Sequence, residues 1–227
     1  MSKIQKEKKT ALDFLDDNRQ WLSDFHMEIW NLAEPAFREY RSAAAYVKLL
    51  RDDGWTVEEG SGEMPTAFCA VWGEGKPVIG GFAEYDAVPG TSQANVPYKK
   101  PRDEKLHPYA AGHTDPHSAL GAGALFGFLA AKHAMEKHGL KGKLKLFGEP
   151  AEKVCGSKPV HAAKGYFDDF NASLPYHPSG YNTVRYEINA ASYWNTRARS
   201  VKSKFFPSTL FRTSKINPNS WRTLRLV

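Results

Sequence analysis

The sequence has little cysteine and no long apolar run. Cys69 and Cys155 are the only cysteines among 227 residues, too few for a disulfide framework, which fits a reducing compartment. No apolar stretch is long enough to span a bilayer. The basic first ten residues are not followed by the apolar segment that a secretory signal requires. We therefore expect a cytoplasmic protein with no membrane partner.

Acidic residues are missing from the end of the chain. Residues 188–227 contain eight Lys and Arg and no Asp or Glu, whereas the rest of the chain holds 23 basic residues and all 25 acids. We therefore predict a main domain at residues 1–194 and a basic tail without a recognisable domain at residues 195–227. Such a tail can attract nucleic acid or another anionic surface. It carries no nucleic-acid-binding motif, however, and a solvated tail is the simpler interpretation.

What is present predicts a folded α/β protein. Hydrophobic residues make up 41% of the chain and charged residues 25%, which excludes wholesale disorder. Apolar spacing, proline and glycine predict helices over residues 12–32, 42–53, 116–138 and 158–164. Strands are predicted at residues 55–58, 66–72, 77–83, 143–148 and 172–176, with a hairpin turn at 73–75 and a loop at 89–108. This order favours a layered sheet with helices on both faces.

Two segments place acids and histidines at a strand end and at a helix start, where open α/β sheets bind ligands. Glu84 and Asp86 follow an apolar strand, and a spacing of two on an extended chain directs both carboxylates to the same side. His113, Asp115 and His117 lie just before or at the start of the predicted helix 116–138. Histidine and acidic side chains are the usual ligands of catalytic zinc.

Two further segments also follow predicted strands. Glu149 and Glu152 come after the strand at 143–148, and a carboxylate there can act as the general base that amide hydrolysis needs. His177 follows the last predicted strand and precedes Pro178. Each segment also has an ordinary interpretation, because Asp115 can simply cap a helix and Glu152 can lie in a solvated loop. Together the four segments predict a hydrolytic metal site at one edge of the sheet.

The same segments resemble the zinc-dependent aminoacylase and carboxypeptidase superfamily, and within it the B subunits of aminobenzoyl-glutamate hydrolases. The likeness covers roughly residues 29–177. It is carried, in the family's order, by GKPVIGGFAEYDAVPGTSQ, AAGHTDPHSALGAGAL, KGKLKLFGEPAEK and AAKGYFDDFNASLPYHP. The resemblance implies the N-terminal part of a di-zinc peptidase-like catalytic domain. The lid domain and the closing part of the catalytic domain are not recognised, so we expect a shortened relative.

The resemblance also implies a reaction and roles for matching residues. Metal-activated water would attack the amide of an N-acyl amino acid or dipeptide. Asp86 matches an acid that supports the metal centre, and His113 matches the histidine of a Cys-Gly-His motif. Glu152 matches the general base, and His177 matches a metal ligand. The implied cofactor is one or two divalent ions, with zinc as the expected metal, and a homo- or hetero-oligomer stays open.

Two positions depart from the family pattern. Ala111 stands where the family has a ligating cysteine, and Lys153 stands where it has a second, ligating glutamate. Asp115 and His117 are candidates to replace the missing ligands. A site with a single metal, or with no metal, is an alternative. A further alternative is a catalytically inactive or truncated relative that binds a ligand or a partner protein.

Overall fold

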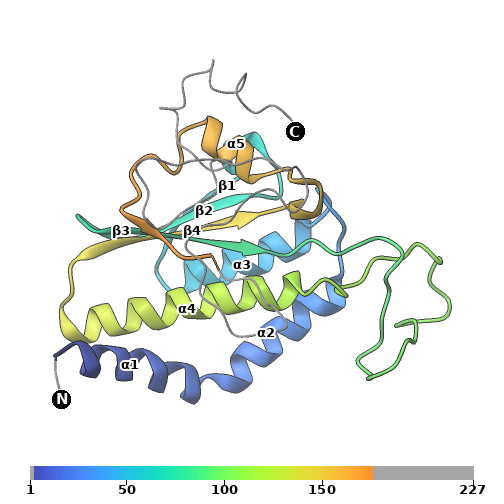
Figure 1. The fold of residues 1–227 in the computed structure, drawn as a ribbon, viewed down its shortest axis with the longest axis horizontal. Coiled ribbons are helices and arrows are strands. Elements are labelled where there is room, and N and C mark those ends of the chain that lie inside the picture. The colour runs from blue at the N-terminus through green and yellow to red at the C-terminus, as the bar shows by residue number, and fades with distance from the viewer. Residues whose placement is uncertain (1–2, 176–227) are drawn as a thin grey trace, which may run out of the picture.

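The computed structural model describes residues 3–175 as a mixed sheet with helices on both faces (Figure 1), as the sequence predicts. The helices are α1 (Lys3–Asp17), α2 (Arg19–Leu32), α3 (Tyr40–Asp52), α4 (His117–His138) and α5 (Lys158–Ala163), with single 3-10 turns η1 (Ser61–Glu63) and η2 (Glu152–Val154). The strands are β1 (Thr56–Glu59), β2 (Phe68–Glu74), β3 (Val78–Glu84), β4 (Gly142–Glu149) and β5 (Ala172–Ser173). Residues 89–108 form no helix or strand, as predicted.

The strand order in the sheet is β1-β2-β4-β3-β5. β2 pairs antiparallel with β1 and β4, whereas β3 runs parallel to β4 and β5. The parallel pair arises because α4 carries the chain from the end of β3 back to the start of β4. The carboxyl ends of β3 and β4 therefore meet at one edge of the sheet, with Glu84 paired to Glu149.

The predicted hairpin at residues 73–75 is wrong, because β4 lies between β2 and β3. Gly73 belongs to β2 and pairs with Lys143 of β4. A Cβ atom at Gly73 would lie 2.5 Å from the carbonyl oxygen of Gly142, so glycine allows this close approach of two strands. Gly73 marks a strand contact, and the short connection at residues 75–77 passes across the end of β4 rather than forming a two-strand hairpin turn.

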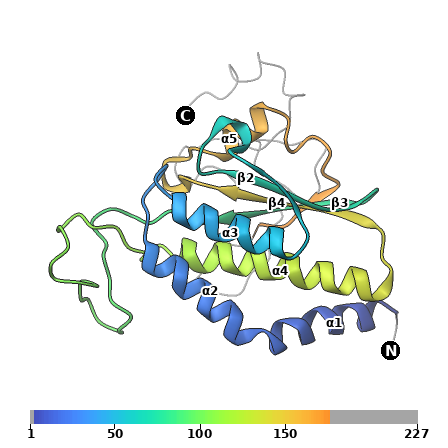
Figure 2. The same ribbon diagram turned by 180° about the vertical axis from the view of Figure 1, so that it is seen from behind.

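The single helix predicted over residues 12–32 is also wrong, because the structure divides it into α1 and α2 at Asn18. The side-chain amide of Asn18 donates a hydrogen bond to the carbonyl of Phe14 at 2.8 Å. Asparagine competes in this way with the helical backbone, so the chain bends while its apolar spacing continues. The two helices lie along the outer side of α4 (Figure 2).

Two apolar clusters fix the sheet between its helices. The larger cluster lies on the side of α2, α3 and α4, and its largest buried side chains include Tyr46, Phe68 and Phe126. The smaller cluster lies on the side of α5 and joins Phe82, Phe147 and Phe167. The sheet is therefore buried on both faces, which holds its carboxyl edge in a fixed place.

The described residues include no helix that is long and apolar enough to cross a membrane. Of the strand predicted at 172–176, the structure shows the two residues of β5. The predicted ligand His177, the domain boundary at residue 194 and the basic tail lie outside the described residues.

Candidate metal centre

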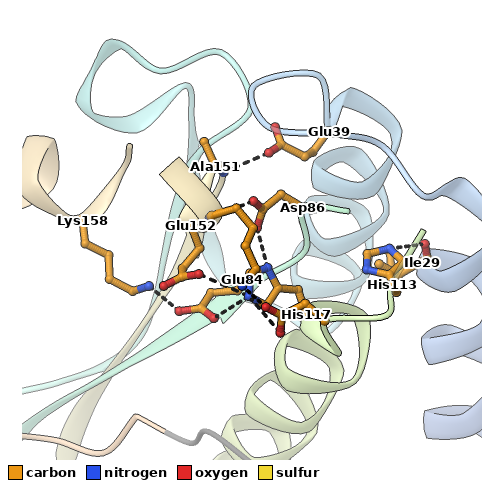
Figure 3. Close-up of polar contacts among 11 residues, drawn as sticks. Ile29, Glu39, Glu84, Asp86, His113, His117, Ala151, Glu152 and Lys158 are labelled. Carbon is orange, nitrogen blue, oxygen red and sulfur yellow. Dashed lines mark hydrogen bonds and ion pairs between the residues drawn. The ribbon is translucent and has the colours of Figure 1, made fainter. Parts of the chain in front are cut away.

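Buried and partly buried polar side chains gather at the carboxyl edge of the sheet (Figure 3). Glu84 is the last residue of β3, and Asp86 follows two residues later. Glu152 begins the η2 turn that follows β4, and His117 begins α4. The backbone after β3 is held by hydrogen bonds from Ala87 N to Glu34 O and from Val88 N to Gly112 O. The fold thus brings together residues that are distant in sequence.

His117 lies at the centre of this cluster and is fully buried. Its Nδ1 atom lies 2.6 Å from Asp86 Oδ1. Its Nε2 atom faces three carboxylates, at 3.3 Å from Glu152 Oε2, 3.7 Å from Glu84 Oε2 and 3.7 Å from Asp115 Oδ1. Within the described chain this buried nitrogen has no hydrogen-bond partner of acceptable geometry. A buried polar atom without a partner is uncommon and calls for an explanation.

The surrounding carboxylates decide the charge of His117 in the protein alone. Burial by itself would lower the pKa of this imidazole, but the hydrogen bond to Asp86 and the proximity of Glu152 and Glu84 raise the pKa to about 10. The same contact affects the pKa of Asp86. Burial would raise this pKa, but the hydrogen bonds with His117 and with Lys153 N lower it overall. A cation that binds at Nε2 must therefore displace a proton.

Asp86 acts as the support of His117. Its Oδ1 atom holds the imidazole, and its Oδ2 atom accepts a hydrogen bond from the backbone N–H of Lys153 at 3.1 Å. The carboxylate is fully buried, so both contacts are shielded from water. A carboxylate that holds one nitrogen of a histidine while the other nitrogen points to an open position is the usual arrangement around bound metals.

Two lysines lie beside the cluster. Lys158 Nζ pairs with Glu84 Oε1, and Lys153 Nζ pairs with Asp115 Oδ2. Burial lowers the pKa of Lys158, but the negative charges of Glu84 and its neighbours raise it above its ordinary value overall. Lys158 therefore stays an ammonium ion inside the protein.

The donor set fits a divalent metal ion. Glu84, His117 and Glu152 each offer one ligand atom, and these atoms lie within 4.8 Å of one another. The unpartnered Nε2 of His117 points into this group, and imidazole nitrogen with carboxylate oxygen is a donor set that zinc prefers. Asp115, on the same side of His117, offers a further carboxylate.

Comparison with known proteins identifies the family. Over 169 residues the chain is 34% identical to the B subunit of p-aminobenzoyl-glutamate hydrolase from Escherichia coli (strain K12), covering 74% of this chain and 34% of that protein. This chain belongs to the amidohydrolase superfamily of aminoacylases and carboxypeptidases. It is also 28% identical over 139 residues to hippurate hydrolase of Campylobacter jejuni, covering 61% of this chain and 34% of that protein. It thus spans about a third of these curated superfamily members.

Solved structures support the fold of this superfamily member. A dinuclear metal-binding peptidase of the M20 family from Bacillus subtilis matches with a TM-score of 0.57 at 20% identity, covering 70% of this chain and 42% of that chain. An aminobenzoyl-glutamate utilization protein from Klebsiella pneumoniae matches with a TM-score of 0.51 at 17% identity, covering 72% and 45%. No protein-family profile matches the chain.

The structure brings four of the predicted site residues together and leaves one apart. Asp86, Asp115, His117 and Glu152 form the cluster, whereas His113 lies to one side of it (Figure 3). His113 Nε2 donates to the carbonyl of Ile29 at 3.2 Å, and burial lowers the pKa of this imidazole to about 4. The sixth predicted site residue, His177, lies outside the described residues.

Sequence reasoning missed two residues that support the cluster. Glu39 is buried, and its carboxylate accepts hydrogen bonds from Ala151 N and from Thr66 Oγ1, both at 2.9 Å. Ala151 directly precedes Glu152 and has a left-handed backbone, with φ of 56°, so Glu39 holds the turn that presents Glu152. The other is Lys158, 74 residues from its partner Glu84. No local pattern signals either contact.

Proposed function

We propose that this chain corresponds to the N-terminal part of a metal-dependent amidohydrolase that cleaves the amide of an N-acyl amino acid or dipeptide. The observation that carries the proposal is the buried Nε2 atom of His117. It lacks a hydrogen-bond partner among residues 3–175, it faces three carboxylates, and its ring is held from the other side by Asp86. A divalent cation is the species that such a nitrogen and such carboxylates would bind together.

We infer that His117, Glu84 and Asp115 hold the metal, and that His177 adds a ligand. Asp115-Pro116-His117 has the spacing of the family's Cys-Gly-His motif, so Asp115 takes the place of the cysteine and His117 that of the histidine. His113 is then a structural residue: its Nε2 is engaged by Ile29, and its buried Nδ1, although also without a partner among the described residues, forms no ion pair with a described carboxylate, unlike His117 Nε2. Zinc is the metal we propose, because it accepts nitrogen and oxygen ligands and supports hydrolysis.

A divalent metal bound here would lower the pKa of a water molecule and polarise the amide carbonyl. Glu152 is suited to the proton transfers, since its side chain is 33% exposed, compared with 14% for Glu84 and 20% for Asp115. Its carboxylate can take a proton from water and pass it to the leaving amine. Glu39 keeps the preceding turn in place through Ala151, and Asp86 keeps the imidazole of His117 oriented.

The substrate class rests on the names of the relatives. The curated relatives are one component of a p-aminobenzoyl-glutamate hydrolase, a hippurate hydrolase and Xaa-Arg dipeptidases. The first two names describe an aromatic acyl group joined to an amino acid, and the third describes a dipeptide. We propose substrates of these kinds for this chain.

A second candidate function is binding of the same ligands without turnover. One observation favours it: the ammonium group of Lys153 pairs with Asp115, one of the proposed metal ligands. In that case the metal centre would position a ligand without promoting attack by water.

The decisive experiment compares the 227-residue chain after chelator treatment and after reloading with Zn²⁺. Amine release would be measured from p-aminobenzoyl-glutamate, hippurate and an Xaa-Arg dipeptide. We expect zinc-dependent release, and Glu152→Gln should lower its rate by about 10²–10⁴-fold because the general base is lost. Glu136→Gln, on an exposed part of α4, is the matched control.

The outcomes separate the proposals. A chain that binds no metal contradicts both candidate functions. A chain that binds metal and ligand but releases no amine supports the second function over the first. A Glu152→Gln variant that keeps full activity would show that the general base is another residue.

A further inference from the structure

Each of two acids in the cluster divides its oxygens between His117 and a lysine. Glu84 Oε2 lies 3.7 Å from His117 Nε2, and Glu84 Oε1 pairs with Lys158 Nζ. In the same way, Asp115 Oδ1 lies 3.7 Å from His117 Nε2, and Asp115 Oδ2 pairs with Lys153 Nζ. The inner oxygens, Glu84 Oε2 and Asp115 Oδ1, therefore face one position beside His117 Nε2. The outer oxygens, Glu84 Oε1 and Asp115 Oδ2, are each already paired with a lysine ammonium group.

Asp86, which supports His117, also has both of its carboxylate oxygens engaged. Asp86 Oδ1 holds His117 Nδ1, and Asp86 Oδ2 accepts the backbone N–H of Lys153. Both oxygens of this buried carboxylate are therefore used within the protein. A metal pair is usually held by carboxylates that place one oxygen on each ion. In this cluster Glu84, Asp86 and Asp115 have no second oxygen left for that purpose.

The charge balance of the site also indicates a single divalent ion. Four carboxylates have an oxygen within 3.7 Å of a ring nitrogen of His117, namely those of Glu84, Asp86, Asp115 and Glu152. Once a metal ion has displaced the proton of His117, the ammonium groups of Lys153 and Lys158 reduce the charge of these four carboxylates from −4 to −2. One divalent ion makes this group neutral, whereas a second would leave it with a charge of +2. An unbalanced charge is costly in a partly buried site.

We propose that the site takes a single divalent cation, and that the ammonium groups of Lys158 and Lys153 occupy the outer sides of Glu84 and Asp115 in place of a second one. This inference rests on the proposed function, because it assumes the metal at His117. It separates this chain from the Bacillus subtilis neighbour, which is described as dinuclear.

The test is a calorimetric titration of the chelator-treated 227-residue chain with Zn²⁺, with bound zinc counted by elemental analysis after dialysis. The variants are Lys153→Met, Lys158→Met and the double variant, which keep side-chain length and remove charge. Lys132→Met is the matched control. Its side chain is 12% exposed, compared with 11% for Lys158, and it also pairs with acids, but it lies 15 residues further along α4 from His117.

We expect one zinc per wild-type chain and one per Lys132→Met chain. Each single site variant should bind that ion about tenfold more tightly or better, because a nearby positive charge is removed. The double variant should bind a second equivalent. Lys153→Met keeps the test usable if Lys158→Met fails to fold, since the Lys153 side chain is 39% exposed. Circular dichroism would verify folding.

Two results would overturn the inference and leave the proposed function intact. One is two equivalents of zinc in the wild-type chain. The other is a double variant that binds one equivalent with unchanged affinity. No zinc in the wild-type chain would instead contradict the proposed function itself, so the two failures are distinguishable.

Discussion

Two buried histidines in this protein, His117 and His161, have similar partners at Nδ1 but different surroundings at Nε2. His117 and His161 are both fully buried, and each places Nδ1 near a carboxylate, at 2.6 Å from Asp86 and 2.9 Å from Glu149. His161 Nε2 lies 2.8 Å from Ser61 Oγ, so both of its nitrogens are satisfied. His117 Nε2 faces only carboxylate oxygens and has no such partner in the described structure.

This difference separates a structural histidine from a candidate ligand. Ser61, His161 and Glu149 are linked by side-chain hydrogen bonds in the order of a nucleophilic triad. All three residues are fully buried, however, so substrate cannot reach the serine hydroxyl. Its function is to join η1, α5 and the end of β4. His117 lies at the same edge of the sheet, but its Nε2 has no hydrogen-bond partner among the described residues. Burial and a carboxylate partner are thus common to both, and the partner of Nε2 decides the role.

The largest predicted effect on stability is that of His161→Ala. The substitution leaves Glu149 and Ser61 without their partner in the interior and opens a cavity between α5 and β4. Loss of one member of a buried pair should lower the free energy of unfolding by about 3–5 kcal/mol. Urea denaturation would measure it, with His107→Ala, at an exposed loop position, as the control that changes little. A His161→Ala protein as stable as wild type would mean that this network contributes nothing.

Ser61→Ala should have a smaller effect. It removes the hydroxyl from His161 Nε2 and leaves that nitrogen buried without a partner, as His117 Nε2 is now. The expected loss is about 1–3 kcal/mol of unfolding free energy. This variant sharpens the comparison, because it gives His161 an unpartnered Nε2 without placing carboxylates around it. Zinc titration should detect no added site, and a second zinc equivalent would show that an open nitrogen alone is enough.

The smallest predicted effect concerns a carboxylate outside both histidine networks. Burial alone would raise the pKa of Glu34, but hydrogen bonds from Ser42 and Arg41 lower it below its ordinary value of 4.5. A lowered pKa in the folded state stabilises the protein above pH 4.5, and this stability is lost as pH falls through the folded-state pKa.

Glu34→Gln should therefore cost about 1 kcal/mol at neutral pH and less as the solution becomes acidic. Urea denaturation of the metal-free protein at several pH values would measure the difference. If the cost of Glu34→Gln stays constant into acid, the acid sensitivity of the fold has another origin, and the carboxylates around His117 would be the next to replace.

Much of the fold follows from local sequence patterns, and the errors have physical causes. The start of α4 near Pro116 and the acids that follow β3 and β4 are local features, so spacing and turn residues predict them. The place of β4 between β2 and β3 is not local, because it depends on the crossover through α4 and on the strand contact that Gly73 allows.

The site residues also divide into those that local sequence patterns predict and those that depend on distant contacts. Glu84 and Asp86 are two residues apart in sequence, and both carboxylates face His117, as strand geometry predicts. The choice between His113 and His117 cannot be made from motif matching alone, because the two residues are four positions apart. It depends on where α4 begins and on which ring reaches Asp86. Contacts such as Glu39 with Ala151, 112 residues apart, leave no pattern in the sequence.

The most direct test of the account is zinc binding by His117→Gln and His161→Gln, measured side by side with wild type by calorimetric titration. We predict one zinc equivalent for wild type and for His161→Gln, and none for His117→Gln. At a free zinc concentration a hundredfold above the dissociation constant, the first two should gain about 2.7 kcal/mol of stability and the third none. Zinc binding by His117→Gln with wild-type affinity would contradict the account.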